Sequence, residues 1–378
     1  MRAAWLLLVL VAMPSCGAPR GSREEPPVTL RLASPEPLAF ARASVPRAFR
    51  LPDDHGPHFE FQTEWWYYTG QLRSEDGRRF GFQLTFFRRG LSPGPPPVSG
   101  LATNQVYFAH FAVSDVAADR HASAERVSRG AAGLAGASGE PFRVFVEDWT
   151  ADATSPDGGM LRLRARDGAL VLDLELRATK PLVAHGDRGL SPKSGEPGNA
   201  SYYVGYTRMT ARGRVGTDGA GVAAAGEAWF DHEWSTSALG PNAVGWDWWS
   251  LQLDDGRELM LFEIRHADGR RGEASSGTLV EPDGRGRRLQ PADFEVKVPR
   301  RWTSPHTRAD YPAAWSIRVP SESLALDVEP LVADQEMRTS FVYWEGAVSL
   351  TGTSRGRPLG GQGYVELTGY ARSMQGVF

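Results

Sequence analysis

The chain has 378 residues, of which 42 are basic and 45 acidic, and it carries one cysteine and a formal net charge of −3. This mixed charge, with no basic stripe, argues against a nucleic-acid partner, and one cysteine excludes an internal disulfide. No apolar run after the first is long enough to span a membrane as a helix, and the length suits two domains.

The N-terminal segment, residues 1–16, has the pattern of a lipoprotein signal peptide. Arg2 precedes an apolar run over residues 3–13, and Cys16 follows the run directly after a small residue. A run this short does not span a bilayer as a helix. We expect a lipid anchor on Cys16, which predicts a cell-envelope location at the outer membrane or the periplasmic face. The alternative is a chance cysteine in a cleaved signal peptide.

Residues 17–50 are rich in Pro, Arg, Ala and Ser, which predicts a flexible tether. Beyond the tether, short alternating runs bounded by Gly, Asp and Pro recur, and helical periodicity is hard to find. The aromatic residues gather in these runs, as they do in β-structure with a large apolar interior. The sequence therefore predicts an all-β fold of the sandwich or barrel type.

An internal repeat indicates that the body arose by duplication. The two copies are Glu64-Trp65-Trp66 through Gln71-Leu72 to Asp76-Gly77-Arg78, and Asp247-Trp248-Trp249 through Gln252-Leu253 to Asp255-Gly256-Arg257. Each copy predicts a β-hairpin closed at an Asp-Gly turn, but a generic hairpin does not explain the paired tryptophans. With the boundary in the Gly- and Ala-rich stretch 213–226, the expected units are an N-terminal barrel domain at 51–225 and a C-terminal barrel domain at 226–378.

Polar residues among aromatic ones mark candidate sites, and the densest group runs from Phe230 to Trp234. Strand alternation places His232 and Trp234 on one face and Asp231 and Glu233 on the other. An inward His232 beside an indole would donate or accept protons in an apolar setting; the alternative is an outward or core-satisfied histidine. An apolar cavity enclosed by a closed barrel is the default binding site, although the aromatic residues could equally fill solid cores.

Glu263 lies in a strand whose neighbours are all apolar. If the preceding turn is a three-residue loop with Gly256 left-handed, Asp247 faces Glu263 across the hairpin. Two adjacent carboxylates in a water-poor pocket cannot both ionise cheaply, so one is a candidate general acid. A two-residue loop would separate them. The first copy has Leu84 at the position of Glu263, so the hairpin itself does not require an acid there.

The first copy offers a structural contrast, because Glu64 pairs with Arg88 in the same register and predicts a plain ion pair. His55 and His58 could share a metal with Glu60 or His232, but only if distant strands converge. The chain lacks a helix-borne zinc motif, a serine nucleophile elbow, a phosphate loop and a dinucleotide fingerprint in usable context. We therefore expect no metal and no other cofactor.

Four segments carry a family resemblance: Glu64-Trp-Trp-Tyr-Tyr-Thr-Gly, Ala228-Trp-Phe-Asp-His-Glu-Trp-Ser, Gly245-Trp-Asp-Trp-Trp-Ser and Gly363-Tyr-Val-Glu-Leu-Thr-Gly-Tyr. Over about residues 52 to 372 the chain resembles the AttH-like family of lipocalin-like proteins, which is related to carotenoid 1,2-hydratase. The resemblance implies two tandem lipocalin-like barrels. It also implies metal-free hydration of an isoprenoid double bond, in which an acid protonates the alkene and water captures the carbocation.

By the same resemblance, the family's histidine and tryptophan fall on His232 and Trp234, and its aspartate falls near Glu263. Glu for Asp, and Phe262 in the neighbourhood of a family tyrosine, are departures. Our predicted catalytic residues are Glu263, His232 and Asp247. The residues predicted to bind a ligand are Trp66, His110, Asp231, Trp234, Trp248, Trp249 and Phe262.

The expected function is binding of an elongated apolar molecule, isoprenoid or lipid-like, by a protein anchored to a membrane through its lipid. Hydration of that molecule is the enzymatic form of this hypothesis. The first alternative is a non-catalytic lipid carrier that works with an envelope transporter. A second alternative is a secreted hydrolase or a pericyclase of the same fold, since distant proteins of this fold include pericyclases, although the sequence shows no nucleophile in a recognisable setting.

Overall fold

The computed structural model describes residues 40–98, 100–236, 239–240 and 242–377. Its helices there are three single turns of the 3-10 type, η1 (Asp53–His55), η2 (Pro291–Asp293) and η3 (Pro320–Glu322). No helix of the described ranges has the length and apolar character needed to cross a membrane. The predicted all-β fold is confirmed. The predicted signal peptide with Cys16, and residues 17–39 of the tether, lie outside the described residues.

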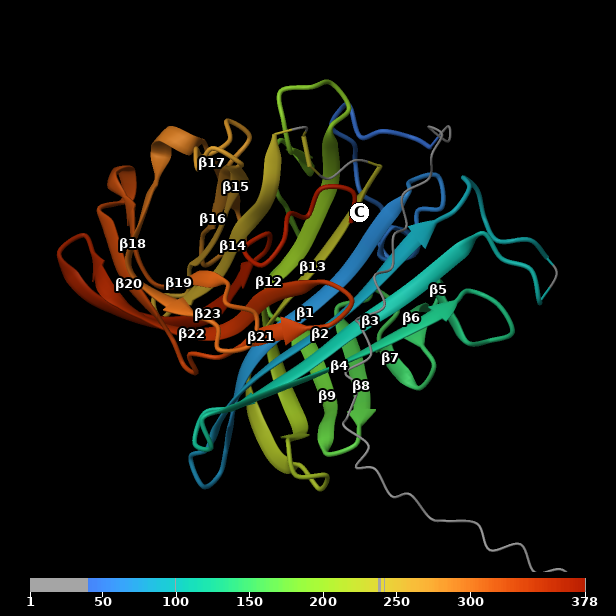
Figure 1. Cartoon of the computed structure of the whole chain (residues 1–378), viewed down its shortest axis with the longest axis horizontal. Coiled ribbons are helices and arrows are strands. Elements are labelled where there is room, and N and C mark those ends of the chain that lie inside the picture. The colour runs from blue at the N-terminus through green and yellow to red at the C-terminus, as the bar shows by residue number, and fades with distance from the viewer. Residues whose placement is uncertain (1–39, 99, 237–238, 241, 378) are drawn as a thin grey trace, which may run out of the picture.

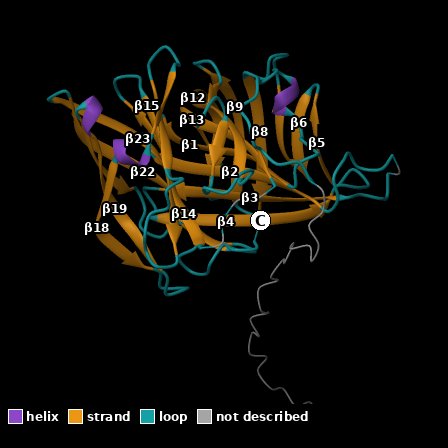
Figure 2. Ribbon diagram, turned by 90° about the horizontal axis from the view of Figure 1, so that it is seen from above, coloured by secondary structure: helices purple, strands orange, loops and turns teal. Residues whose placement is uncertain are grey.

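Two curved sheets divide the described chain, and they lie side by side in Figures 1 and 2. The first sheet has the strand order β4-β3-β2-β1-β13-β12-β9-β8-β7-β6-β5, with β10 and β11 also paired to β12. Its strands are β1 (Thr63–Ser74), β2 (Arg79–Gly90), β3 (Gln105–Asp115), β4 (Arg120–Arg129), β5 (Ala135–Gly139), β6 (Phe142–Val146), β7 (Trp149–Ala153), β8 (Met160–Asp167), β9 (Leu170–Ala178), β10 (Val183–Ala184), β11 (Leu190–Pro192), β12 (Ala200–Gly216) and β13 (Val222–Ser235).

The second sheet has the order β17-β16-β15-β14-β23-β22-β20-β19-β18, with β21 paired to β22. Its strands are β14 (Ala243–Leu253), β15 (Glu258–His266), β16 (Ser276–Val280), β17 (Gly286–Leu289), β18 (Glu295–Thr303), β19 (Asp310–Val319), β20 (Leu324–Pro330), β21 (Glu336–Arg338), β22 (Val342–Ser354) and β23 (Arg357–Leu367).

In each sheet the last long strand pairs with the first, so that the order β3-β2-β1-β13-β12-β9 is matched by β16-β15-β14-β23-β22-β20. This closure curls each sheet into a barrel-like form, and the first is nearly closed (Figure 1). The prediction of two tandem lipocalin-like barrels is confirmed. The matching strand order is also what duplication of one barrel would produce.

Strand alternation explains the paired tryptophans of the repeat. In β1, Trp66 points into the core of the first barrel, whereas Trp65 points toward the second barrel. In β14, Trp249 points into the core of the second barrel and Trp248 toward the first. Each pair therefore serves two apolar layers, because successive side chains of a strand leave on opposite faces.

The boundary predicted from the Gly- and Ala-rich stretch at 213–226 is wrong. That stretch is the hairpin between β12 and β13, and β13 pairs with β1 along its length. The change of sheet falls between Ser235 and Ala243. The small residues there have a packing reason: a Cβ on Gly226 would lie 2.0 Å from the carbonyl oxygen of Gln71.

The tether prediction also needs correction for residues 40–50, which are packed against the first barrel. Phe40 and Ala43 are buried, and the Phe49 ring meets the edge of Trp234 at 5.9 Å. The hydroxyl of Tyr202 donates a hydrogen bond of 2.9 Å to the carbonyl of Val45. The apolar side chains in this part of the segment give it a docking site that its composition alone did not indicate.

The glutamines of the two repeat copies join the barrels. Gln71 Nε2 donates to the carbonyls of Val348 and Gly363 in the second sheet, at 2.7 and 2.9 Å. Gln252 Nε2 donates to the carbonyls of Thr207 and Ala228 in the first sheet, at 2.9 and 3.0 Å. Both amides are buried, so these reciprocal bonds satisfy carbonyls that water does not reach.

We predict that Gln71→Ala and Gln252→Ala each lower the free energy of unfolding by about 1–3 kcal/mol, because each leaves two buried carbonyls without their donor. Urea unfolding measures the change. Gln62→Ala, which alters a half-buried glutamine outside this interface, serves as the control and should change stability by less than about 0.5 kcal/mol. Equal effects for all three variants would contradict the joining role.

Candidate functional site

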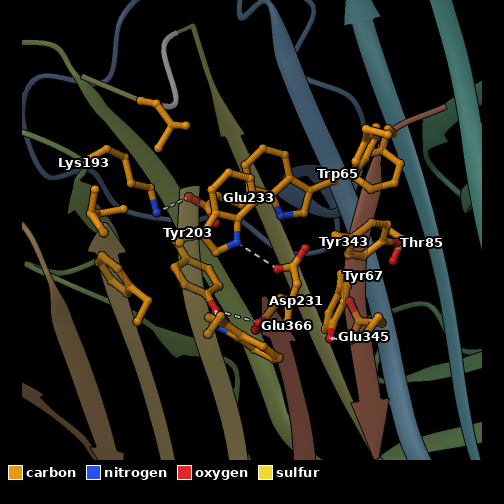
Figure 3. Close-up of a pocket in the computed structure, with 17 residues that line it drawn as sticks. Trp65, Tyr67, Thr85, Lys193, Tyr203, Asp231, Glu233, Tyr343, Glu345 and Glu366 are labelled. Atoms are coloured by element: carbon orange, nitrogen blue, oxygen red, sulfur yellow. Dashed lines mark hydrogen bonds and ion pairs between the residues drawn. The ribbon is translucent and has the colours of Figure 1, made fainter. Parts of the chain in front are cut away.

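A cleft between the two barrels gathers aromatic side chains and four carboxyl groups (Figure 3). Its aromatic lining comes from both sheets: Trp65, Tyr67, Phe87, Tyr203, Trp246, Trp248, Phe262, Phe341 and Tyr343. Its carboxyl groups belong to Asp231, Glu233, Glu345 and Glu366. A concave, largely apolar site with a few converging polar groups is the usual form of a small-molecule site.

The strands that flank the closure of each barrel position these carboxyl groups. In β13, Asp231 and Glu233 are two residues apart and leave on the same face. Glu345 of β22 is directly opposite Glu366 of β23 in the antiparallel register. Like charges at directly opposed positions are unfavourable, so this pairing favours at least one protonated carboxyl group.

Asp231 is an acid that burial keeps protonated near neutral pH. Burial, with a smaller contribution from the Glu233 charge, raises the pKa of Asp231 to about 8, although the hydrogen bond from Tyr203 opposes the shift. The Tyr203 hydroxyl donates to Oδ2 at 2.6 Å, and Trp248 Nε1 donates to the same hydroxyl oxygen at 3.1 Å. The other oxygen, Oδ1, has no hydrogen-bond partner among the described residues.

The opposed glutamates behave in the same way. Burial, and next the charge of Glu366, raise the pKa of Glu345 well above its ordinary value. Burial raises the pKa of Glu366 to about 7, against a hydrogen bond of 2.9 Å from Trp246 Nε1. Tyr67 donates a hydrogen bond of 2.7 Å to Glu345 Oε1. The cleft thus holds three carboxylic acids that retain protons at or near neutral pH.

Glu233 differs from these three acids because a cation neutralises it. Lys193 Nζ lies 2.6 Å from Glu233 Oε1 and 4.7 Å from the centre of the Phe262 ring. Figure 3 shows this ion pair at one side of the labelled group, apart from Glu345 and Tyr343. Lys193 follows β11, so a loop of the first barrel supplies the charge that pairs with Glu233.

The structure does not bring the predicted catalytic residues Glu263 and His232 together. The predicted turn and register are present: Leu253 N donates to Arg257 O, Gly256 is left-handed with φ +85°, and Asp247 is opposite Glu263. However, Asp247 and Glu263 alternate with cleft-lining neighbours and therefore face into the second barrel, away from the cleft.

Each of these two carboxylates also has a cation. Glu263 lies 3.1 Å from Arg271 Nε, and Asp247 accepts bonds of 2.8 Å from Arg265 Nε and from the Tyr370 hydroxyl. Burial raises the pKa of Glu263 to about 7, so the expected proton retention is present. The position differs from the prediction, because this pair belongs to the second barrel while His232 lies inside the first.

Of the predicted ligand-binding residues, Asp231, Trp248 and Phe262 line the cleft. Trp66 and Trp249 are in the cores of the first and second barrels. Trp234 stacks on His58 with ring centres 3.8 Å apart, and it belongs to the apolar cluster that packs against residues 40–50. His110 does not line the cleft but contacts a residue that does, because its Nδ1 lies 2.9 Å from the hydroxyl of Tyr343.

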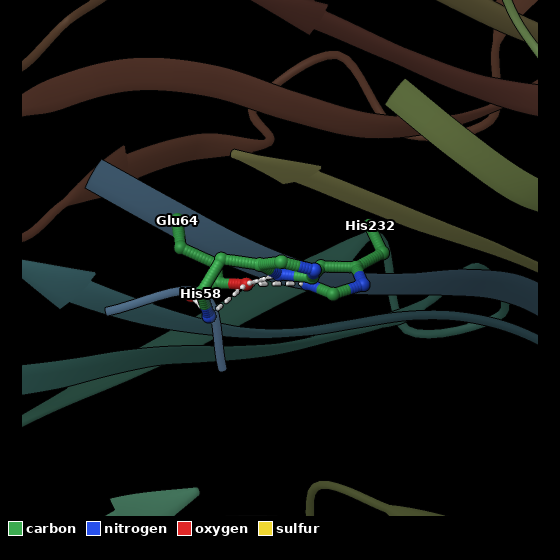
Figure 4. A group of neighbouring side chains, drawn as sticks. All are labelled: His58, Glu64 and His232. Carbon is green, nitrogen blue, oxygen red and sulfur yellow. Dashed lines mark hydrogen bonds and ion pairs between the residues drawn. The ribbon is translucent and has the colours of Figure 1, made fainter. Parts of the chain in front are cut away.

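His232 belongs to a buried charge network with His58 and Glu64 (Figure 4). Glu64 Oε1 lies 2.8 Å from His58 Nδ1 and 2.8 Å from His232 Nε2. Glu64 Oε2 accepts a bond of 2.8 Å from Arg88 Nε, which confirms the predicted Glu64–Arg88 pair. These contacts tie the segment after η1 to strands β1, β2 and β13.

The charges of this network are set by Arg88 as well as by the imidazoles. Burial alone would raise the pKa of Glu64, but the charges of Arg88 and His58 hold it well below its usual range. Burial lowers the pKa of His232, so its neutral ring donates Nε2–H to Glu64. The three side chains offer ligand atoms within 4.8 Å of one another, the kind of set a transition metal uses. Here Arg88 already supplies the positive charge on the shared carboxylate.

Sequence reasoning missed Tyr67, Tyr203, Glu345, Glu366 and Lys193. Strand alternation correctly separated Asp231 and Glu233 from His232. We expected the ligand on the face of His232, inside a barrel, whereas the cleft is lined by the other face. A signal for Glu366 was present, because it is the one acidic residue in the apolar run 363–367 of a segment that carries the family resemblance. Nothing local marked Lys193, whose role depends on the loop before β12.

The comparisons with known proteins agree on one family and fold. A model of the AttH-like family matches residues 42–370. A solved structure assigned to AttH, from Nitrosomonas europaea, is 35% identical and has a TM-score of 0.79, and the match covers 88% of this chain and 100% of that chain. Kievitone hydratase from Nectria haematococca is 15% identical with a TM-score of 0.67, covering 89% and 98%. No curated protein matches the sequence.

We predict that Glu64→Gln lowers the free energy of unfolding by about 3–5 kcal/mol, because it leaves the buried Arg88 without its counter-charge. Urea unfolding again provides the measurement. Glu175→Gln is the matched control: Glu175 pairs with Arg212 at 2.9 Å on the surface, and its loss should cost less than about 1 kcal/mol. A loss below about 1 kcal/mol for Glu64→Gln would show that the network is not a stabilising one.

Asp231→Asn should change how stability depends on pH. The folded protein holds the Asp231 proton up to about pH 8, whereas the unfolded chain loses it near the ordinary value of 3.8. The folded state therefore binds more protons between these values, and this group makes the wild type less stable as pH rises through that window. Unfolding free energies at about pH 5 and about pH 8 should show the variant gaining on the wild type at the higher pH. A constant difference would contradict a raised pKa.

Proposed function

Because the chain belongs to the AttH-like family, we propose that it binds an elongated apolar molecule, isoprenoid or lipid-like, in the cleft between its barrels and hydrates a double bond of that molecule by acid catalysis. The observation that carries the proposal is the convergence of three protonated carboxyl groups, those of Asp231, Glu345 and Glu366, in an aromatic cleft. Kievitone hydratase, which has the same fold, is a hydratase by name.

An acid for alkene protonation must hold its proton at neutral pH and must meet the substrate in a site with little water. Burial raises the pKa of Glu366 to about 7, and its half-buried side chain lines the largely aromatic cleft, where a substrate can reach it. Asp231 is the second candidate, with an unbonded oxygen and a pKa of about 8. In the proposed reaction the carboxyl proton forms the new C–H bond and the π electrons of the alkene accept it.

The carbocation left after protonation requires stabilisation until water captures it. Trp65, Trp246 and Trp248 present indole rings in the cleft, and the π face of an indole attracts a cation more strongly than other side chains do. The carboxylate formed by proton transfer adds a negative charge at short range. Capture then forms a C–O bond, and the oxygen releases a proton to give the alcohol.

A non-catalytic lipid carrier is the second candidate, and the aromatic lining of the cleft favours it equally because such a lining binds apolar ligands without any chemical step. In either case we propose that the protein is exported, held by a lipid on Cys16 and located in the cell envelope, where it would meet membrane-derived ligands. The signal peptide pattern of residues 1–16 supports this location.

To test the proposal, the purified protein is incubated with geranylgeraniol in heavy water and the products are analysed by mass spectrometry. We expect a product that has gained the elements of one water molecule and carries one new C–D bond. Glu366→Gln or Asp231→Asn should lower turnover by about 10²–10⁴-fold, because the amide cannot give a proton to the alkene. Turnover should fall as pH rises, with its midpoint near 7 if Glu366 is the acid and near 8 if it is Asp231.

Asp327→Asn is the control, because it removes an exposed carboxylate of β20 and should leave turnover unchanged. Bound geranylgeraniol that is recovered unaltered would favour the carrier and reject catalysis on this class of substrate. Loss of turnover only in Glu263→Gln would return the acid to the position predicted from the sequence.

A further inference from the structure

A chain of hydrogen bonds leads from the cleft to the outside of the first barrel. The hydroxyl of Tyr343, a cleft residue of β22, lies 2.9 Å from His110 Nδ1 on β3. His110 Nε2 lies 2.9 Å from Glu125 Oε1 on β4. Figure 3 shows Tyr343 beside Thr85 and above Tyr67 and Glu345, within the labelled group of the cleft.

The protonation states fix the direction of these bonds. Burial alone would raise the pKa of Glu125, but the hydrogen bond from His110 and those from Ser340 lower it, so Glu125 is an anion. Burial, followed by the charge of Glu345, raises the pKa of Tyr343 well above its ordinary value, so its hydroxyl keeps its proton. His110 Nε2–H therefore donates to the Glu125 anion, and in the neutral imidazole Nδ1 is then the nitrogen that accepts from the Tyr343 hydroxyl.

The surroundings of His110 suit proton transfer. The rings of Phe87, Phe108 and Phe341 have centres 5.3, 5.8 and 4.9 Å from its own. Such a setting excludes water and strengthens the bonds that His110 makes. Glu125 is 21% exposed, so the far end of the chain reaches solvent. A carboxylate bonded to the far nitrogen of the imidazole is also the group that orients a catalytic histidine and stabilises its imidazolium.

We propose that Tyr343, His110 and Glu125 form a proton relay in which Tyr343 is the base at the cleft, while His110 and Glu125 are positioning residues that act through it. This inference rests on the proposed hydration. When water captures the carbocation, its proton passes to the Tyr343 oxygen as Tyr343 gives its own proton to His110 Nδ1. The Glu125 carboxylate stabilises the resulting imidazolium. Once the alcohol has left, the Nδ1 proton returns through Tyr343 to water in the cleft, which restores the starting tautomer of His110. The acid that protonated the alkene is reprotonated from solvent, so no proton is gained or lost overall.

An activated phenol can be detected without the natural substrate, by its reaction with benzenesulfonyl fluoride, a small apolar reagent. The phenol oxygen forms an O–S bond, the S–F bond breaks with loss of fluoride, and His110 accepts the phenol proton. Peptide mass spectrometry locates the modified tyrosine and gives its rate of modification. We expect modification of Tyr343, slowed at least about tenfold in His110→Gln and in Glu125→Gln, because each removes or misdirects the base.

His121→Gln is the matched control. His121 is half-buried on β4, and its Nδ1 lies 2.9 Å from Ser114 Oγ of β3, away from the cleft lining. In His121→Gln, the rate at which Tyr343 is modified should equal that of the wild type. Glu125→Gln keeps His110 in place, so it tests the relay even if His110→Gln unfolds, which near-UV circular dichroism would show. Unchanged rates in both variants, or no modification of Tyr343 in the wild type, would overturn the relay.

The same experiment separates the relay from the proposed function. Modification of Tyr343 that depends on His110, without turnover of geranylgeraniol, would support the relay and reject this hydration. Turnover with modification that ignores His110 would support the hydration and reject the relay.

Discussion

The contact between the two barrels is the constraint on which the site depends. Every strand at this contact sends one set of side chains into its own barrel and the other set toward the neighbouring barrel. The second set, which includes Asp231, Glu345 and Tyr67, is removed from water by a partner that is itself made of strands. Carboxyl groups in such a layer have mainly one another and a few hydroxyls as neighbours. Burial there favours the protonated, neutral form over the carboxylate.

Both barrels have the same strand order but not the same chemistry, as expected if one barrel was duplicated and the copies diverged. Gln71 and Gln252 still perform reciprocal tasks across the contact, as expected if the two copies once met as equal partners. The copies have since diverged at the carboxyl positions. The first barrel supplies Asp231 from β13, and the second supplies both Glu345 and Glu366 from its own closing strands. The site therefore exists only where both barrels are present.

Local sequence patterns correctly predicted turn type, hairpin register and the residue pairs that face each other within a hairpin. The Asp-Gly turn determined the register that places Asp247 opposite Glu263, and the same logic correctly paired Glu64 with Arg88. The face that lines the cleft was not predictable in this way, because alternation separates Asp231 from His232 without showing which of the two faces meets the other barrel. The domain boundary was wrongly placed at the glycines near residue 213 for a similar reason. A Cβ on Gly213 would lie 2.1 Å from the Asp173 carbonyl oxygen, so this glycine is needed for close strand packing, which the sequence alone does not show.

The retained protons of the cleft also determine its net charge. At neutral pH Asp231 and Glu345 are protonated and uncharged, and the charges of Lys193 and Glu233 cancel in an ion pair. The recess is therefore close to electrically neutral, which favours uncharged molecules over ions. In alkaline solution, once Asp231 and Glu366 ionise, the same walls become an anionic chamber that repels acids and attracts amines. The acidity of the surrounding solution therefore sets the electrostatic character of this recess through its carboxyl groups alone.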